Sequence, residues 1–143
     1  MLASSSRPEA FICDVDGTVA LKGDRNPFDY ASVDRDRPNT PIVQLVRMLI
    51  TNGIQAVFVS GREELARAKT EEWLISHIGV SGPLMMRANG DYRPDSEIKH
   101  EMYINQILGK FDVGLVLDDR DQVVEMWRTR AGLTCLQVAQ GDF

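Results

Sequence analysis

The sequence contains few of the features that mark membrane, secreted or fibrous proteins. Its only two cysteines, Cys13 and Cys135, lie in apolar runs, so we expect buried free thiols and no disulfide framework. No apolar run approaches the roughly 20 residues needed to cross a bilayer, and the N-terminus lacks the apolar region of a secretory signal. We therefore expect no membrane partner and a cytoplasmic location.

Basic residues are also in short supply. The chain has 16 Lys and Arg against 21 Asp and Glu, which gives a net charge of −5. This balance argues against a protein that coats nucleic acid with a broad basic face. The length of 143 residues fits one domain, which we place at residues 9–143 behind a flexible leader of residues 1–8.

Short apolar runs alternate with segments of helical periodicity along the chain. Strands are predicted at 10–15, 54–59, 84–86, 113–117 and 133–138, and helices at 42–50, 63–78, 96–108 and 121–130. This alternation predicts an α/β fold with a parallel sheet that is covered on both faces. Residues 19–40 break the rhythm with Gly, Asn and Pro, so we expect an irregular flap there, too short to form a cap domain.

Charged and polar side chains follow three of the predicted strands. Asp14 and Asp16 close the first strand, Ser60-Gly61-Arg62 follows the second, and Asp118-Asp119 follows a third. The carboxyl ends of parallel strands meet at one edge of a sheet, where ligands bind in open α/β folds. Four carboxylates at one edge require cations, and Mg²⁺ together with Arg62 and Lys99 would provide a site for a phosphoryl group.

The motifs and their order resemble those of a known enzyme family. Asp14-Val15-Asp16-Gly17-Thr18, Ser60, Lys99 and Asp118-Asp119 look like the four motifs of the haloacid dehalogenase (HAD) phosphohydrolase superfamily. Longer matches around these motifs and at the C-terminus resemble the 3′-phosphatase domain of bacteriophage polynucleotide 5′-kinase/3′-phosphatase. The resemblance implies a Rossmann-like three-layer fold with a parallel sheet, a short flap and no large cap domain. The sequence has no Gly-x-x-x-x-Gly-Lys-Ser/Thr loop, which a kinase half would carry.

The same resemblance implies roles for the acidic residues. Asp14 would attack phosphorus to form an aspartyl-phosphate, and Asp16 would first protonate the leaving oxygen and then activate water. The Asp14 carboxylate, the Asp16 main-chain carbonyl and Asp118 would hold Mg²⁺. Lys99 would be the catalytic cation on the transferring phosphoryl group, with Asp119 in support of Lys99 or of a metal-bound water.

The remaining implied residues would bind the substrate. Thr18 would also orient Asp16, and Ser60 would hold the phosphoryl group together with Lys99. Glycine at position 61 would let backbone N–H groups approach the phosphate. The implied substrate-binding set is Thr18, Ser60, Gly61, Arg62 and Arg87.

We therefore expect a Mg²⁺-dependent polynucleotide 3′-phosphatase that acts on DNA or RNA ends in a bacterium or a phage-infected host. The sequence leaves open separate 5′-kinase or ligase partners, a homo-oligomer, and contacts of a polynucleotide backbone with Arg25, Arg35 and Arg37 of the flap. Three alternatives also stay open. They are a phosphatase for nucleotides or sugar phosphates, a phospho-acceptor signalling domain, and an inactive HAD-like binding module.

Overall fold

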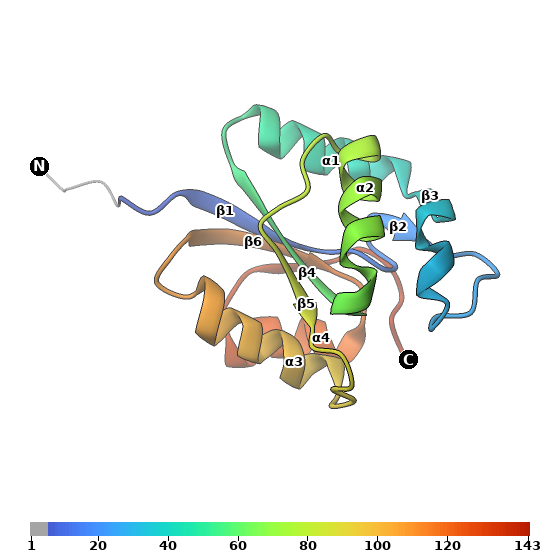
Figure 1. Cartoon of the computed structure of the whole chain (residues 1–143). Helices are drawn as coiled ribbons and strands as arrows, with labels where there is room; N and C mark the ends of the chain where they lie inside the picture. The colour runs from blue at the N-terminus through green and yellow to red at the C-terminus, as the bar shows by residue number, and fades with distance from the viewer. Residues whose placement is uncertain (1–5) are drawn as a thin grey trace, which may run out of the picture.

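A five-stranded parallel sheet forms the middle of the molecule (Figure 1). The computed structural model describes residues 6–143, so residues 1–5 of the expected leader lie outside the described part of the chain. The order of the strands in the sheet is β5-β4-β1-β6-β7. Their bounds are β1 (Glu9–Asp14), β4 (Gln55–Glu63), β5 (Leu84–Arg87), β6 (Asp112–Asp118) and β7 (Cys135–Gln137).

Helices cover both faces of this sheet, which confirms the predicted three-layer α/β fold. The helices are α1 (Thr40–Thr51) and α2 (Arg67–His77) on one face, and α3 (Asp95–Met102) and α4 (Asp121–Glu125) on the other. In β1, Phe11 and Cys13 pack with α1 and α2, whereas Ala10 and Ile12 pack with α3 and α4. Successive side chains of a strand point to opposite faces, so a strand covered on both sides must be apolar throughout.

The helices after β5 and β6 end in π-helical turns. Helix α3 continues into η3 (Tyr103–Ile107), and α4 continues into η4 (Met126–Arg130). With these turns the two helices span nearly the predicted ranges 96–108 and 121–130. The two cysteines are buried and unpaired, as predicted.

Strand β4 is longer than predicted. We expected it to stop at Val59, but it continues through Ser60-Gly61-Arg62 to Glu63, and a 3₁₀ turn, η2 (Glu64–Ala66), follows. The pairing with β5 shifts register between Ser60 and Glu63, and Arg87 Nε donates a hydrogen bond of 2.8 Å to the Gly61 carbonyl. The chemically important Ser60 and Arg62 therefore lie on a strand and not on the loop after it.

The flap contains more regular structure than the sequence indicated. Strands β2 (Ala20–Leu21) and β3 (Arg37–Pro38) form a small antiparallel pair, and η1 (Tyr30–Arg35) is a 3₁₀ helix. Trp73 Nε1 of α2 donates a hydrogen bond of 2.7 Å to the main-chain carbonyl of Asp36. This bond ties the end of the flap to the core.

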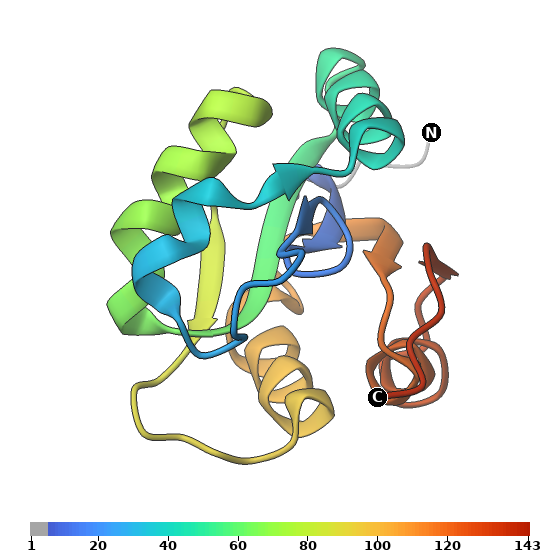
Figure 2. The same cartoon turned by 90° about the vertical axis from the view of Figure 1, so that its right-hand side faces the viewer.

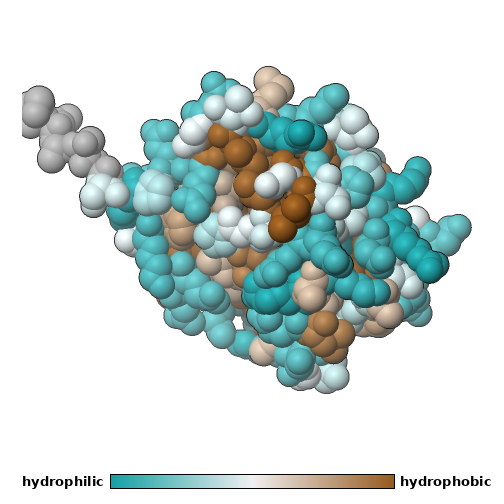
Figure 3. All heavy atoms as spheres, turned by 45° about the horizontal axis from the view of Figure 1, so that its top comes forward, coloured by the Kyte–Doolittle hydropathy of each residue, from teal (hydrophilic) through white to brown (hydrophobic). Residues whose placement is uncertain are grey.

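Apolar residues are visible on one face of the molecule (Figure 3). Apolar atoms gather on the face that α1 presents (Figure 3), where Met48 is exposed. Within residues 6–143, no helix is long and apolar enough to cross a bilayer.

Candidate active site

The ends of two neighbouring strands bring three carboxylates together. Asp14 is the last residue of β1, Asp118 is the last residue of β6, and Asp119 follows it. Oxygens of these three buried side chains all lie within 4.8 Å of one another. Figure 2 shows this end of the sheet, where the β1 and β6 arrowheads lie next to each other. The predicted meeting of acidic residues at one edge is therefore found for Asp14, Asp118 and Asp119.

Lys99 enters the cluster from α3. Its Nζ lies 2.7 Å from Asp14 Oδ1 and 3.1 Å from Asp118 Oδ2, and its side chain is only 1% exposed. Asp118 Oδ2 also accepts a hydrogen bond of 3.1 Å from Trp127 Nε1. A buried lysine is costly unless its charge is paired, so this geometry fixes the ammonium between the two carboxylates.

Thr18 and Gly17 shape the other side of the cluster. The fully buried Thr18 hydroxyl lies 3.0 Å from Asp14 Oδ2 and 3.3 Å from Asp119 Oδ1, so it contacts these carboxylates and not Asp16, which the resemblance implied it would orient. Gly17 has φ +82°, and a Cβ there would lie 2.2 Å from Asp119 Oδ2. Glycine is required at this position both for the backbone conformation and for the space that Asp119 occupies.

Among residues 6–143, the cluster holds three carboxylates and only one ammonium, so its negative charge is not fully compensated. Burial and the nearby Asp118 charge raise the pKa of Asp14 well above its ordinary value, although the Lys99 ammonium opposes this shift. Burial likewise raises the pKa of Asp119. Burial alone would lower the pKa of Lys99, but the carboxylates of Asp118, Asp14 and Asp95 outweigh it and raise that pKa.

A divalent cation fits this set of donors. Three converging carboxylates with one buried ammonium leave excess negative charge, and all the donors are oxygens, which Mg²⁺ prefers. Bound metal would favour the ionised form of the same carboxylates whose pKa values burial raises. The residues that could hold the ion are Asp14, Asp118 and Asp119, so Asp119 contributes to the carboxylate set more directly than the sequence indicated.

Asp16 lies outside this cluster and has cationic neighbours. Arg62 binds its carboxylate through Nε (3.0 Å to Oδ2) and Nη2 (2.7 Å to Oδ1), and Arg25 Nη2 lies 3.7 Å from Oδ1. The sequence analysis expected Asp16 to join the other three carboxylates at this edge, whereas its carboxylate lies beside two arginines. The Asp16 side chain is 43% exposed, so it is held in place yet open to a ligand.

Arg62 is the centre of this second network. Its side chain is 2% exposed, and it binds Asp16, Asp36 Oδ2 (2.9 Å) and the Thr70 hydroxyl (2.9 Å). Asp36 also receives a two-point hydrogen bond from Arg25, at 2.8 and 2.9 Å. Arg62 therefore binds Asp16 from the buried side of that carboxylate. Its donors point to protein groups and not to the open surface, where we expected substrate contact.

Arg87 is likewise engaged by the protein. Beyond Gly61, it binds Asp95 Oδ1 at 2.9 Å, and a Cβ on Gly61 would lie 2.2 Å from that same oxygen. The Asp95 carboxylate lies 3.8 Å from Lys99 Nζ. Arg87 and Gly61, both predicted to bind substrate, thus lie against Asp95, which is beside Lys99.

Ser60 is the remaining predicted residue. It is fully buried, and its Oγ accepts a hydrogen bond of 3.1 Å from the Arg62 backbone N–H. The sequence analysis missed Asp36, Thr70 and Asp95 as functional residues. Of these, only Asp95 had a local signal, since it lies one helical turn before Lys99.

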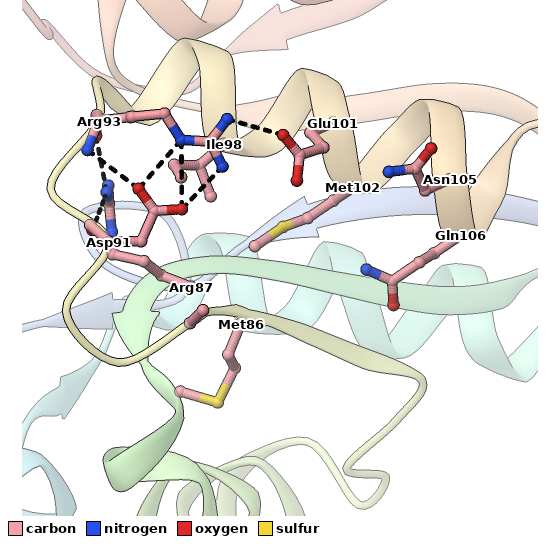
Figure 4. Close-up of a pocket in the computed structure, with 10 residues that line it drawn as sticks. Met86, Arg87, Asp91, Arg93, Ile98, Glu101, Met102, Asn105 and Gln106 are labelled. Atoms are coloured by element: carbon pink, nitrogen blue, oxygen red, sulfur yellow. Dashed lines mark hydrogen bonds and ion pairs between the residues drawn. The ribbon is translucent and has the colours of Figure 1, made fainter.

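A separate hollow of about 180 Å³ lies under the loop after β5 (Figure 4). Its lining includes Met86, Ile98 and Met102, together with the Arg93 side chain. None of the three clustered carboxylates lines it. This hollow is therefore distinct from the candidate active site.

Comparisons with known proteins agree with this geometry. Residues 8–143 match the family described as the polynucleotide kinase PNKP phosphatase domain, of HAD type. A relative from Autographa californica nuclear polyhedrosis virus, named "Putative bifunctional polynucleotide kinase/RNA ligase", is 35% identical over 124 residues. That alignment covers 85% of this chain and 18% of the viral protein.

Solved structures show the same relationship. A chain from a structure titled "Structure of Pnkp1/Rnl/Hen1 complex" superposes with a TM-score of 0.93 and 41% identity, covering 98% of this chain and 49% of the other. The class C acid phosphatase of Bacillus anthracis has the same fold, with a TM-score of 0.58 at 14% identity over 83% of this chain and 54% of that one. This chain thus spans about half the length of its solved relatives and less than a fifth of the viral relative.

The family match covers nearly the whole chain, and four of the expected motif residues, Asp14, Lys99, Asp118 and Asp119, form one buried cluster. A HAD-type phosphatase domain is a phosphoric monoester hydrolase. The chain belongs to the family of polynucleotide kinase phosphatase domains within the HAD phosphatases.

Proposed function

We propose that this domain is a Mg²⁺-dependent polynucleotide 3′-phosphatase that works through an aspartyl-phosphate. The observation that carries the proposal is the buried contact of Lys99 with Asp14 and Asp118, beside Asp119. This arrangement brings together a carboxylate that can act as a nucleophile, a lysine ammonium in a fixed position and a site for a divalent ion, all at the ends of adjacent strands. Phosphoryl transfer needs these groups, because its catalysis depends on positioning and charge neutralisation.

Asp14 is the proposed nucleophile. Its Oδ1 binds the Lys99 ammonium and its Oδ2 lies by the Thr18 hydroxyl, so two contacts fix the plane of the carboxylate. Attack of an Asp14 oxygen on phosphorus forms the acyl-phosphate and breaks the bond to the 3′-oxygen of the substrate. Lys99 holds positive charge at the reacting centre.

Asp16 is the proposed acid and base. It delivers a proton to the leaving 3′-oxygen, and it then takes a proton from the water that attacks phosphorus and releases phosphate from Asp14. Arg62 and Arg25 hold the Asp16 carboxylate while a large part of it stays exposed. Arg62 is thus a positioning residue for the proton-transfer group.

Asp14, Asp118 and Asp119 would hold the metal ion, with the Asp16 carbonyl as a further candidate donor from the sequence analysis. When bound, Mg²⁺ supplies positive charge that neutralises the phosphoryl oxygens and keeps the nucleophile ionised. The raised pKa values of Asp14 and Asp119 indicate how strongly this cluster favours added positive charge.

The polymer end as substrate is supported by the open architecture and by the relatives. The segment after β1 is a short flap, and residues 6–143 contain no second domain that could close over Asp14. Two solved relatives come from structures of a Pnkp1/Rnl/Hen1 complex, and one of these is described as an RNA repair complex. We therefore include RNA 3′-phosphate ends as substrates, and a kinase or ligase as partner.

The test compares phosphate release from matched single strands of RNA and DNA that carry either a 3′-phosphate or a 5′-phosphate, with Mg²⁺ and with EDTA. The proposal predicts Mg²⁺-dependent release from the 3′-phosphate strands alone. Equal release from 5′-phosphate strands would contradict the end specificity. Preferred release from free nucleotides or sugar phosphates would favour a small-molecule phosphatase, the alternative that the sequence left open.

A further inference from the structure

Two exposed aromatic side chains lie on loops at the edge of the sheet that holds the active site. Phe28, in the flap after β1, is 80% exposed, and Tyr92, in the loop after β5, is 86% exposed. Both loops extend from the end of the sheet that faces the viewer in Figure 2. Aromatic rings this exposed gain little from the fold, and both faces of each ring are available for contact with a ligand.

An arginine side chain binds the backbone on both sides of each aromatic residue. Nη1 of Arg25 binds the carbonyls of Pro27 and Asp29, on either side of Phe28, at 3.4 and 3.3 Å. Nη1 of Arg87 binds the carbonyls of Asp91 and Arg93, on either side of Tyr92, at 2.8 and 2.7 Å. Arg25 also binds Asp36 through Nε and Nη2, and Arg87 also binds Asp95 through Nη2, so each arginine connects its loop to the networks of the candidate active site.

The loop that carries Tyr92 has further braces. Figure 4 shows Arg93 bound to Asp91 and to Glu101 of α3, both at 2.7 Å. The backbone N–H of Gly90 donates to Glu63 Oε1 at the end of β4. Tyr92 is therefore presented by a rigid loop, which lowers the ordering cost of binding a ligand to the ring.

The two loops belong to one continuous surface. Helix η1 of the flap contacts η2, and the backbone N–H of Leu65 in η2 donates to Asn89 Oδ1 in the loop after β5. Leu65 is itself 63% exposed, so the segment that contacts both the flap and the loop after β5 also presents an apolar side chain to solvent. We call Phe28, Leu65 and Tyr92 the apolar rim.

Four of the basic side chains near the rim are committed to protein groups, whereas Arg35 and Arg37 of the flap are exposed. Arg25, Arg87 and Arg93 bind carboxylates and main-chain carbonyls, and Arg62 is buried. These four arginines therefore offer few free donors for the phosphates of a polynucleotide. Stacking on aromatic rings is the main alternative source of affinity for a single strand, and it tolerates any base sequence.

We infer that Phe28 and Tyr92 are stacking platforms for the nucleobases that precede the 3′-phosphate, with Leu65 as a further apolar contact. The inference rests on the proposed polynucleotide substrate. On this inference, the apolar rim gives a polynucleotide end additional binding affinity that a small phosphate ester without adjoining bases cannot gain. The terminal phosphate enters the Asp14 site while the adjoining bases leave it across the rim.

The experiment measures the Kd of a fluorescein-labelled single strand with a 3′-phosphate by fluorescence anisotropy, in EDTA so that turnover does not interfere. Each of Phe28→Ala and Tyr92→Ala is expected to raise Kd about 5- to 150-fold, the equivalent of one lost base stack. Tyr92→Phe keeps the ring and should bind like the wild type. Ile75→Ala, at a residue of α2 that is 56% exposed, is the matched control and should leave Kd unchanged.

A second arm changes the strand, so that its main comparison, intact against abasic strand on the wild-type protein, does not depend on variants that fold. A strand with abasic sites at the two positions before the terminal nucleotide should bind the wild type more weakly than the intact strand does, and at least as weakly as the intact strand binds to Tyr92→Ala. The two losses should not add when the abasic strand meets the variant. Equal Kd values for intact and abasic strands would overturn the inference.

These outcomes separate the inference from the proposed function. Binding that depends on the apolar rim, without phosphate release in Mg²⁺, would refute the phosphatase proposal and keep the stacking surface. If phosphate is released from 3′-ends but Phe28→Ala and Tyr92→Ala leave Kd and KM unchanged, the stacking surface is refuted and the phosphatase proposal is kept.

Discussion

Arg62 binds Asp16 and Asp36 with the same guanidinium, at 2.7 and 2.9 Å from Nη2. One partner is the proposed proton-transfer group, and the other is a buried carboxylate at the end of the flap. Because Asp36 also binds Arg25, it fixes both arginines that face Asp16. The flap therefore contributes to the position of Asp16, the proposed acid and base.

Replacing Asp36 tests this arrangement. In Asp36→Asn the two guanidinium groups lose a shared anion, Asp16 loses its fixed position, and kcat should fall about 10- to 100-fold. Removal of one partner from a buried pair also costs about 3–5 kcal/mol of stability, so unfolding in urea should be recorded with the same samples. Asp34→Asn, at the exposed partner of Lys69, is the control and should change neither quantity noticeably. A folded Asp36→Asn protein with wild-type kcat would show that the network has no positioning role.

Gly17→Ala should weaken metal binding. The new Cβ would lie 2.2 Å from Asp119 Oδ2, so this carboxylate must move, and the Kd for Mg²⁺ should rise tenfold or more. The residue would also have to keep φ +82°, which costs about 1–2 kcal/mol. Gly53→Ala separates the two effects, because Gly53 has φ +84° and a Cβ added there would have nothing within 4 Å. It should lose the same stability and keep the Mg²⁺ affinity, as measured by isothermal titration calorimetry.

The stability gained from Mg²⁺ should depend on pH. Burial raises the pKa values of Asp14 and Asp119, so these two carboxyl groups hold more protons in the metal-free folded state than in the unfolded chain. The contribution of these groups to stability is therefore present at low pH and is lost as pH rises from the ordinary carboxyl range through the raised values. Mg²⁺ competes with these protons, so its increase in Tm should be larger at about pH 8 than at about pH 5. An increase of the same size at both pH values would contradict this account of the cluster.

Neither thiol should react in the folded protein. Burial, with a smaller contribution from the Asp118 charge, raises the pKa of Cys135 to about 12, and burial raises the pKa of Cys13 above its ordinary value. Because the thiolate is the reactive form, a chromogenic disulfide reagent at about pH 8 should titrate both thiols in urea and neither in buffer. One rapidly reacting thiol under native conditions would place that cysteine at an accessible surface.

Much of the fold could be predicted because the signals are local. The apolar runs before Asp14 and Asp118 identify buried strands, and the alternation with helical segments indicates a parallel sheet. The edge where ligands bind follows from that topology, which is why Asp14, Asp118 and Lys99 could be expected together.

The second network could not be read in this way. The contact between Asp36 and Arg62 joins positions 26 residues apart, through an ion pair that no spacing rule predicts. Arg62 was expected to face the substrate because it follows Ser60, but the extension of β4 and the burial of its side chain direct its donors to Asp16, Asp36 and Thr70. The destination of a long side chain depends on tertiary contacts that the local sequence does not contain.

The most direct measurement is the rate of phosphate release from a 3′-phosphorylated oligonucleotide in Mg²⁺ by the wild-type protein and by Asp14→Asn. The variant keeps the size of the side chain and removes the nucleophilic carboxylate that binds Lys99. The account predicts a readily measured rate for the wild type and a loss of at least about 10⁴-fold in the variant, since an amide cannot form the acyl-phosphate. Wild-type turnover by Asp14→Asn would contradict the central role of this residue.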